Sequence, residues 1–565
     1  MLNLIPAPKQ IEYKDGYLSL NAIAPFDGQV DGRILDQIAK LPTAKNGCPL
    51  TLNIGSTDSE SYGIEIAPNG IVITADGVRG GFYAVQTLRQ ILANDKVPYL
   101  SLQDEPTFSY RGFYHDITRG KIPTLDTLKS LVDDVAYFKY NSLQLYVEHV
   151  FEFEETKELV KKTGCITKAE LKELDAYCKR NFIDFIPSLS SFGHMFQILE
   201  QPQYKELAVY QGELDANEWK NWLLHHTIDP TNPKSIELVK SLIDQYAGAF
   251  TSDYFNICCD ETFDLKKRYG DAEKELYIDF VKKIIAHVKS KGKKVMMWAD
   301  ILLTYPETID SLPEDTIFLN WDYSPSPSLE NIQNFKALGK TQIVCPGNWS
   351  WNNFVEKIVD GQPNICKMAE YGYSCGAKGM LVTNWGDYNN ICALENSRYG
   401  LILGGEKCWN PTAVIDEKFH DIASKVGYNF DKAMEYYKLA VELQKGISWY
   451  DHCYMYSQLA KGLDYIKKAD YSIEFIKEKQ ALYLDLLNKL QAEKWTNGDY
   501  KRQLINAIGG ICLIVESNAV MSKTPCEKLI DHKAWLKEFS ELWLKSNKPS
   551  ELKLVVEMFE NVYKM

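Results

Sequence analysis

Eight short apolar segments recur between Phe113 and about residue 404, and each is followed by a turn and usually by a helical pattern. The segments lie at residues 112–114, 142–146, 183–186, 254–257, 295–298, 317–320, 342–345 and 380–383. Short apolar runs that alternate with helices indicate parallel strands. Eight parallel strands are the number that closes an α/β barrel, so the sequence predicts a (β/α)8 TIM barrel.

Helical signals occupy several of the connecting segments. Thr124 opens an apolar stripe over residues 125–138, and a second stripe of the same spacing covers residues 236–246. Thr167 and Glu170 have the spacing of a capping box, which predicts the start of another helix. The connections after the fifth to seventh runs are short, so the barrel prediction is weakest there.

The regions on either side of the barrel have different patterns. Before it, two apolar runs at residues 63–67 and 71–74 flank a turn and predict a hairpin, and a helix is predicted at 80–92. Gly80 and Gly81 could suggest a phosphate-binding loop, but no Lys-Ser or Lys-Thr follows them, so a turn into a helix is the preferred interpretation.

After about residue 410 the strand signals stop and apolar residues recur at helical spacing. We therefore predict three domains: a small α/β domain at 1–107, the catalytic barrel at 108–405 and an all-helical domain at 406–565. The helical domain is expected to pack against the barrel or against a second copy of the chain, as a homodimer.

Charge and composition narrow the classes of partner. The 565 residues carry a net charge of −13, which argues against nucleic acid or an anionic membrane and favours a small, neutral ligand. No run approaches the 18 apolar residues of a membrane span. The first residues show no secretory signal, so we expect a cytoplasmic protein, unless a signal has been trimmed.

Cysteine and histidine usage gives no metal signature. The chain has 13 cysteines at irregular spacing without a Cys-x-x-Cys pair, which fits free thiols in a reducing compartment. Its nine histidines include no His-Glu-x-x-His motif, and the pair at 225–226 has no neighbouring ligand types. We expect neither a metal nor a cofactor.

Reactive and aromatic side chains follow the predicted strands, at the end of the barrel where active sites of this fold lie. Carboxylates, histidines, an arginine and several tryptophans share these positions. The candidates are Arg119, Glu148, His149, His194, Asp260, Glu261, Trp298, Trp321, Tyr323, Trp351, Trp385 and Asp387. Aromatic faces cover the C–H surfaces of sugars while charged groups bind hydroxyls, so the pattern favours a carbohydrate ligand.

Asp260 and Glu261 form the most specific feature, because they directly follow the apolar strand at 255–259. An isolated Asp-Glu pair is most often part of a solvated turn. At the end of a buried strand, however, two adjacent carboxyl groups repel each other, and such an arrangement can keep one of them protonated as an acid catalyst.

These residues resemble the β-N-acetylhexosaminidases of glycoside hydrolase family 20. The resemblance covers the N-terminal domain and the whole barrel, and it is carried by residues 81–88, 110–119, 255–261, 298–300 and 384–387. It implies an exo-acting, retaining hydrolase that removes terminal β-linked GlcNAc or GalNAc. The substrate's own 2-acetamido oxygen then attacks the anomeric carbon, an exception to the usual scheme with two catalytic carboxylates.

The resemblance also implies roles for individual residues. Glu261 corresponds to the general acid/base, and Asp260 to the residue that orients and polarises the acetamido group. His194 corresponds to the histidine near the acid, and Arg119 to the arginine that grips the hydroxyls at positions 3 and 4, a bidentate task that suits a guanidinium. Asp387 corresponds to a carboxylate that binds a distal hydroxyl.

The tryptophans Trp298, Trp321 and Trp385 resemble the walls around the N-acetyl group and the sugar ring. Two departures from the family pattern matter: Asp-Met-Pro-Gly-His is replaced by Ser-Ser-Phe-Gly-His at 190–194, and the acidic pair after the second strand by Glu148 and His149. Those two residues are the candidates for supporting the acid. Tyr323 and Tyr388 are the candidates for the tyrosine that contacts the acetamido oxygen.

Two alternatives remain open at the level of sequence. A longer pocket would make the chain a disaccharide-releasing enzyme with the same chemistry. A catalytically silent sugar-binding protein is the alternative from another class, since a fold alone does not prove activity. The intact Asp260-Glu261 pair argues against silence.

Overall fold

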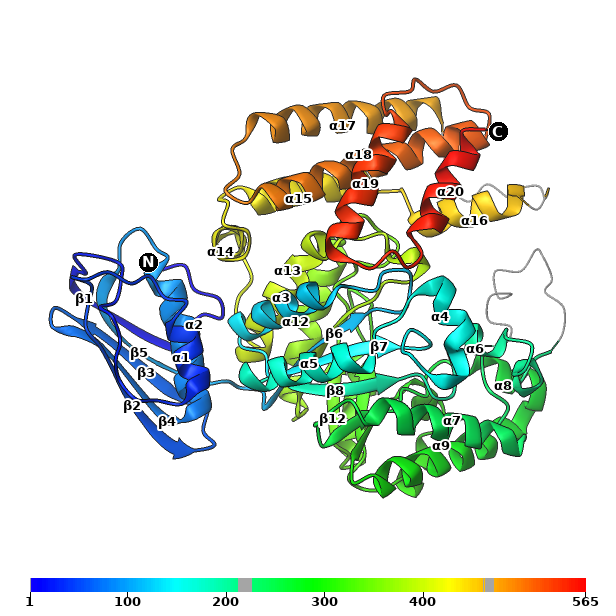
Figure 1. Cartoon of the computed structure of the whole chain (residues 1–565), viewed down its shortest axis with the longest axis horizontal. Helices are drawn as coiled ribbons and strands as arrows, with labels where there is room; N and C mark the ends of the chain where they lie inside the picture. The colour runs from blue at the N-terminus through cyan, green and yellow to red at the C-terminus, as the bar shows by residue number, and fades with distance from the viewer. Residues whose placement is uncertain (1, 212–225, 461, 463–471, 565) are drawn as a thin grey trace.

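The structure is a computed structural model that describes residues 2–211, 226–460, 462 and 472–564. Figure 1 shows a small sheet domain at the N-terminus, a central barrel and a group of C-terminal helices. The predicted fold class, a TIM barrel between a small α/β domain and a helical domain, is confirmed.

The N-terminal domain is a five-stranded sheet with two helices against it (Figure 1). The sheet has the order β1-β5-β3-β4-β2. Its elements are β1 (Gln10–Tyr17), α1 (Gly32–Ile38), β2 (Leu50–Thr57), β3 (Tyr62–Ala67), β4 (Gly70–Gly77), α2 (Val78–Leu92) and β5 (Pro98–Asp104). The predicted hairpin is the antiparallel pair β3 and β4, and the predicted helix is α2.

Gly80 and Gly81 lie inside α2, where they allow the helix to approach its neighbours closely. A Cβ atom on Gly80 would lie 2.3 Å from the carbonyl oxygen of Ser61, and one on Gly81 would lie 2.8 Å from a methyl group of Ile54. Packing of the helix therefore accounts for the two glycines, in agreement with the preferred interpretation.

The barrel is closed by eight parallel strands, one for each predicted apolar run. Their order is β10-β11-β12-β13-β6-β7-β8-β9. They are β6 (Tyr110–Asp116), β7 (Ser142–Val147), β8 (Asp184–Leu189), β9 (Tyr254–Asn256), β10 (Lys294–Trp298), β11 (Ile317–Trp321), β12 (Gln342–Cys345) and β13 (Gly379–Asn384). Parallel strands place all their carboxyl ends at one end of the barrel.

Helices surround the strands, and their starts follow the sequence signals. Thr124 accepts a hydrogen bond from the N–H of Thr127 at the start of α3, and Thr167 and Glu170 form the predicted capping box of α5. The helices are α3 (Leu125–Tyr137), α4 (Lys157–Thr163), α5 (Lys168–Arg180), α6 (Phe196–Leu199), α7 (Pro233–Ala247), α8 (Phe263–Tyr269), α9 (Glu273–Ser290), α10 (Asp300–Thr304), α11 (Leu329–Ala337), α12 (Ile358–Ser374) and α13 (Arg398–Trp409).

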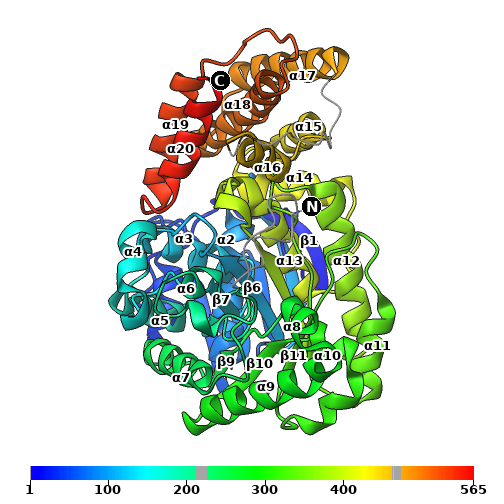
Figure 2. The same cartoon turned by 90° about the vertical axis from the view of Figure 1, so that its right-hand side faces the viewer.

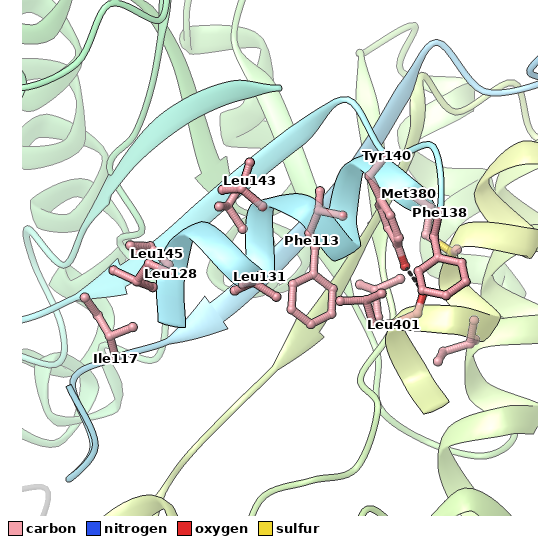
Figure 3. Packing of buried hydrophobic residues seen from close by; sticks show 14 of the residues in the cluster. Phe113, Ile117, Leu128, Leu131, Phe138, Tyr140, Leu143, Leu145, Met380 and Leu401 are labelled. Atoms are coloured by element: carbon pink, nitrogen blue, oxygen red, sulfur yellow. Dashed lines mark hydrogen bonds between the residues drawn. The ribbon is translucent and has the colours of Figure 1, made fainter. Parts of the chain in front are cut away.

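The core between the strands and α3 is built from the predicted apolar stripe. Figure 3 shows Leu131 of α3 beside Phe113 of β6 and Leu143 of β7, all of them fully or almost fully buried. The buried hydroxyl of Tyr140 donates a 2.7 Å hydrogen bond to the carbonyl oxygen of Leu401 in α13. This bond satisfies a polar group inside the core, where an unpaired hydroxyl would be destabilising.

The C-terminal domain is entirely helical in the part that the structure describes. It comprises α14 (Glu417–Tyr428), α15 (Ala433–Gln444), α16 (Trp449–Ala460), α17 (Ile473–Ala492), α18 (Gly498–Met521), α19 (His532–Ser546) and α20 (Leu552–Val562). α18 lies at the centre and contacts α15, α16, α17, α19 and α20.

α18 corrects one expectation from the sequence. Among the described residues it is the one helix that is long and apolar enough to cross a membrane, with a mean hydropathy of 1.7 over its most apolar window. That window is 89% buried inside the molecule. The surrounding helices therefore account for its apolar surface.

The C-terminal domain packs against the barrel, which is one of the two arrangements that we expected. The N–H of Thr124 donates to the carbonyl oxygen of Ser546, and the indole of Trp449 donates to that of Tyr388. Figure 2 shows these helices above the barrel. The homodimer stays a prediction. All 13 cysteines are free in the structure.

Candidate active site

A cavity of about 750 Å³ opens at the carboxyl ends of the barrel strands, and all twelve residues predicted from the sequence line it. The walls also include nine further residues, of which only Tyr388 was named in the sequence analysis, as a candidate for the tyrosine beside the acetamido group. They are Thr118, Phe196, Gln197, His226, Asn352, Tyr388, Asn389, Tyr450 and Glu551. A cavity of this size with convergent polar groups is typical of a small-molecule site.

β9 ends at Asn256 rather than at residue 259 as predicted, and the chain after it bends sharply to bring the carboxyl groups of Asp260 and Glu261 to the cavity. Cys258, Cys259 and Glu261 have φ values of +58°, +68° and +53°, in the left-handed region that side chains other than glycine seldom adopt. Asp260 and Glu261 both line the cavity as a result. Unusual backbone angles of this kind concentrate at functional sites.

His194 lies against both carboxyl groups. Its Nε2 atom is 3.3 Å from Oδ2 of Asp260 and 3.3 Å from Oε2 of Glu261. Burial alone would lower the pKa of His194, but the neighbouring Asp260 and Glu261 raise it to about 10. The ring is therefore an imidazolium at neutral pH that donates to the two acids.

Gly193 allows the loop of His194 to reach this position. A Cβ atom on Gly193 would lie 2.3 Å from the carbonyl oxygen of Asp260, so no larger residue fits without a shift. His226 contacts both His194 and the acid pair. Its Nε2 atom lies 3.2 Å from the carbonyl oxygen of Glu261, and its ring packs edge-on against the ring of His194. The companion residue His225 lies outside the described residues.

Arg119 is held by carboxylates on three sides. Its Nη1 atom lies 3.0 Å from Oδ2 of Asp116 and 3.6 Å from Oδ1 of Asp387, and its Nη2 atom lies 3.4 Å from Oε1 of Glu148. The guanidinium also lies over the ring of Trp385. Burial raises the pKa of Asp387 to about 6, even though the positive charge of Arg119 opposes the rise.

Of the two candidates for supporting the acid, Glu148 is the one near His194. Its Oε1 atom lies 4.0 Å from Nδ1 of the histidine. His149 lines the cavity, but neither of its ring nitrogens has a hydrogen-bond partner among the described residues. Burial lowers the pKa of His149 to about 4, so its ring is neutral.

Aromatic rings form the opposite walls. Trp298 and Trp385 lie with ring centres 5.9 Å apart, and Trp321 stacks on Tyr323 at 4.9 Å. Trp351 packs against Tyr323 at 5.4 Å. The indole N–H of Trp385 donates a 2.7 Å hydrogen bond to the hydroxyl of Tyr323, which fixes both side chains.

Several buried polar atoms of cavity-lining residues lack partners, among them one atom of Asp260 and one of Trp298. Oδ1 of Asp260 and Nε1 of Trp298 form no hydrogen bond with any described residue. Such atoms are uncommon in folded proteins and often belong to a ligand site. The described residues contain no group of three or more His, Cys, Asp or Glu side chains arranged to hold a metal ion.

Asp300 is a further carboxylate below the acid pair, and its Oδ2 atom accepts a 2.9 Å hydrogen bond from the N–H of Glu261. Burial, and then the charge of Asp260, raise the pKa of Asp300 to about 7. Asp300 belongs to residues 298–300, one of the segments that carry the family resemblance. No sequence pattern indicated that Tyr450 and Glu551 would reach the cavity from the helical domain.

Comparison with known proteins agrees with this architecture. The family model for the catalytic domain of glycosyl hydrolase family 20 matches residues 108–414, and that for domain 2 of the family matches residues 1–105. A chitobiase of Flavobacterium johnsoniae has a similar fold, with a TM-score of 0.61 at 17% identity over 99% of both chains. A Vibrio harveyi exo-β-N-acetylglucosaminidase gives 0.60 at 17% identity over 75% of this chain and 76% of its own.

Among curated relatives, a lacto-N-biosidase of Bifidobacterium bifidum is 26% identical over 413 residues, which are 66% of this chain and 35% of the relative. A β-hexosaminidase of Emericella nidulans is 25% identical over 340 residues, 53% of this chain and 54% of the relative. The chain thus spans between about a third and about half of these two relatives. Because the catalytic-domain model alone covers more than half of the chain, the chain belongs to glycosyl hydrolase family 20.

Proposed function

We propose that the chain is a β-N-acetylhexosaminidase that removes terminal, β-linked GlcNAc or GalNAc, in an exo-acting and retaining reaction. The observation that carries the proposal is the unpartnered Oδ1 atom of Asp260, in a cavity wall shared with Glu261 and Trp385. The N–H of a 2-acetamido group is a donor that would satisfy this oxygen.

The proposed mechanism uses the acetamido group as the nucleophile. Asp260 accepts the acetamido N–H and stabilises the positive charge that develops on nitrogen as the carbonyl oxygen attacks the anomeric carbon. Glu261, in the form in which its carboxyl group is protonated, donates that proton to the departing glycosidic oxygen and later takes a proton from the attacking water. His194 donates to both carboxyl groups and so positions them.

The remaining side chains bind the sugar in this proposal. Arg119 and Asp387 provide a donor and an acceptor for ring hydroxyls, and their 3.6 Å separation lets one hydroxyl contact both. Trp298 and Trp385 enclose the acetamido group, which holds its oxygen near the anomeric carbon. Such positioning supplies a large part of the rate enhancement in an intramolecular attack.

A comparison of 4-nitrophenyl glycosides tests the function. We expect hydrolysis of the β-GlcNAc and β-GalNAc glycosides, and rates on the β-glucoside that are lower by orders of magnitude, because the glucoside lacks the nucleophile. A GlcNAc thiazoline should inhibit far more strongly than GlcNAc, since it mimics the cyclised intermediate. Equal rates on glucoside and GlcNAc glycoside would refute substrate assistance, and binding of GlcNAc without turnover would indicate a silent sugar-binding protein.

Release of a disaccharide is the second candidate. It is favoured by the similarity to a protein named lacto-N-biosidase and by the cavity volume of about 750 Å³, which leaves room beyond one sugar ring. The two candidates differ in the first product from a 4-nitrophenyl lacto-N-bioside. Release of nitrophenol from this glycoside, with little from the β-GlcNAc glycoside, would favour the disaccharide-releasing enzyme.

A further inference from the structure

Glu551 reaches the cavity from the helical domain, in the connection between α19 and α20. It is one of the residues that line the cavity. Its N–H donates a 3.3 Å hydrogen bond to the carbonyl oxygen of Gly120, and its Oε2 atom accepts a 3.0 Å bond from the side-chain amide of Asn389. Two barrel loops therefore hold its backbone and its side chain.

These two partners place Glu551 beside the pair that is proposed to bind the sugar hydroxyls. Gly120 directly follows Arg119, and Asn389 is two residues after Asp387. The two loops touch, because a Cβ atom on Gly120 would lie 2.5 Å from the Cα of Asn389, and Gly120 has a φ of +100°. Glu551 thus borders the edge of the cavity that Arg119 and Asp387 form.

The segment that carries Glu551 is firmly attached to the barrel. The N–H of Lys548 donates to the carbonyl oxygen of Ile122 at 2.8 Å, and its ammonium lies 2.7 Å from a carboxylate oxygen of Glu170. The indole of Trp543 donates to the carbonyl oxygen of Lys548 at 2.9 Å. A side chain on such a support can act as a precise binding group, because little freedom is lost when a ligand arrives.

The carboxyl group of Glu551 still has an unused acceptor. Among the described residues Asn389 is the one side chain that donates to it, through Oε2, so Oε1 is available to a ligand. Burial raises the pKa of Glu551, and the charge of nearby Glu148 adds to the rise. A hydroxyl donor at this position would satisfy the half-buried carboxyl group.

We propose that Glu551 is a specificity-determining residue that accepts a hydrogen bond from a hydroxyl group of the terminal sugar, on the side of the ring next to Arg119 and Asp387. The proposal rests on the proposed function for the identity of the sugar. It gives the helical domain a part in substrate recognition, since the domain supplies a wall of the same cavity.

The test is a thermodynamic cycle that combines removal of the Glu551 carboxyl group with removal of single hydroxyl groups from the sugar. The wild type, E551A and E551Q are assayed with 4-nitrophenyl β-GlcNAc and with its 3-, 4- and 6-deoxy analogues. Glu557→Ala is the matched control, because Glu557 is a glutamate of the same domain that forms an exposed ion pair with Lys553. Thermal midpoints of all variants report folding separately.

We expect E551A to lower kcat/KM on the parent glycoside by about 10–100-fold, the range for a hydrogen bond to a charged group, and E551Q to lower it less. For one deoxy analogue, the one that lacks the partner hydroxyl, E551A should have almost no further effect. The E557A variant should match the wild type.

Equal losses on the parent and on all three analogues would overturn the proposal, because Glu551 would then not contact any of these hydroxyls. Wild-type turnover of the parent reports the proposed function independently. Where turnover is absent, the same cycle is measured by calorimetry, as the affinities of the wild type and E551A for GlcNAc and its deoxy analogues. A loss of affinity that vanishes for one analogue supports the proposal, and equal losses for all of them overturn it.

Discussion

The imidazole of His194 lies 3.3 Å from the carboxylate of Asp260, and it faces that residue because the loop before it carries a glycine. The same ring nitrogen lies 3.3 Å from Glu261. One cation therefore links two acids that would otherwise repel each other in a partly desolvated site. Because the family motif is altered at residues 190–194, the sequence did not show which group supports the acid pair. In the structure His194 contacts both acids directly.

The charge of His194 should make stability depend on pH. Its pKa is about 10 in the folded protein against 6.5 for the free side chain, so folding takes up a proton between these values. The stabilisation is complete below pH 6.5 and is lost as the pH rises towards 10, by at most ~1.4 kcal/mol per pH unit. Thermal unfolding of the wild type and His194→Gln at pH 6.5 to 9.5 measures this effect.

The thermal midpoints of the two proteins should converge as the pH rises. Comparing the pair is necessary because burial also raises the pKa of Glu356 to about 8 and that of Glu406 to about 7, and these groups titrate in both proteins. A gap between wild type and variant that stays constant over this range would mean that His194 is not charged in the folded state.

Gly193→Ala should damage catalysis by displacing the acid pair. The new methyl group would start 2.3 Å from the carbonyl oxygen of Asp260, so one of the two loops must move. A displacement of about 1 Å in a catalytic group costs on the order of 10²-fold in rate, and we expect kcat to fall by this amount. Gly498→Ala is the control, since nothing lies within 4 Å of the added carbon. A Gly193→Ala enzyme with normal kcat would show that the loop adapts without moving Asp260.

The barrel was predictable because each of its strands carries its own signal. The strands are short and mostly buried on both sides, as Gln342–Cys345 is over its whole length, and helices such as α5 begin at local capping residues. These patterns need no knowledge of distant contacts. The apolar character of α18 was harder to interpret, since its burial depends on five neighbouring helices.

The site was predictable where its residues end a strand, as Trp298 ends β10, or follow one closely, as Asp260 follows β9. Residues that arrive by long-range packing gave no such signal. Glu551 is separated by 162 positions from its partner Asn389, and only the docking of the helical domain brings them together. His226 was visible as part of a histidine pair, but no sequence pattern indicated its contact with the carbonyl oxygen of Glu261.

Tyr323, rather than Tyr388, should be the tyrosine that contacts the acetamido group. Its hydroxyl accepts the indole hydrogen of Trp385 at 2.7 Å, which leaves the hydroxyl proton to donate to a ligand oxygen. The ring of Tyr388 instead packs on Tyr450, with ring centres 4.7 Å apart. We expect Tyr323→Phe to lower kcat on the β-GlcNAc glycoside by about 10²-fold, as for loss of one oxyanion donor.

Tyr388→Phe is the matched variant for that experiment, and it should lose much less activity. Tyr323→Phe should also destabilise the protein by ~1–3 kcal/mol, because the buried indole N–H of Trp385 loses its acceptor. Assays at a temperature well below the unfolding midpoint separate the two effects. A larger loss of kcat in Tyr388→Phe than in Tyr323→Phe would reverse the assignment.

Glu261→Gln should reveal the acid through its dependence on the leaving group. A sugar alcohol leaves poorly unless it is protonated as the bond breaks, whereas 4-nitrophenolate leaves almost without help. We therefore expect a loss of about 10²–10⁴-fold on a β-GlcNAc-terminated disaccharide and a distinctly smaller loss on the 4-nitrophenyl glycoside. Steady-state kinetics on both substrates with the same enzyme preparation give the two factors.

The comparison separates proton donation from a purely structural effect of the substitution. Glutamine has nearly the same shape as glutamate and can still interact with His194, so a disturbed fold would slow both substrates to the same degree. Equal losses would remove Glu261 from the role of acid. The next residue to test would then be Glu148, because its carboxyl group lies 4.0 Å from the same histidine and in the same cavity.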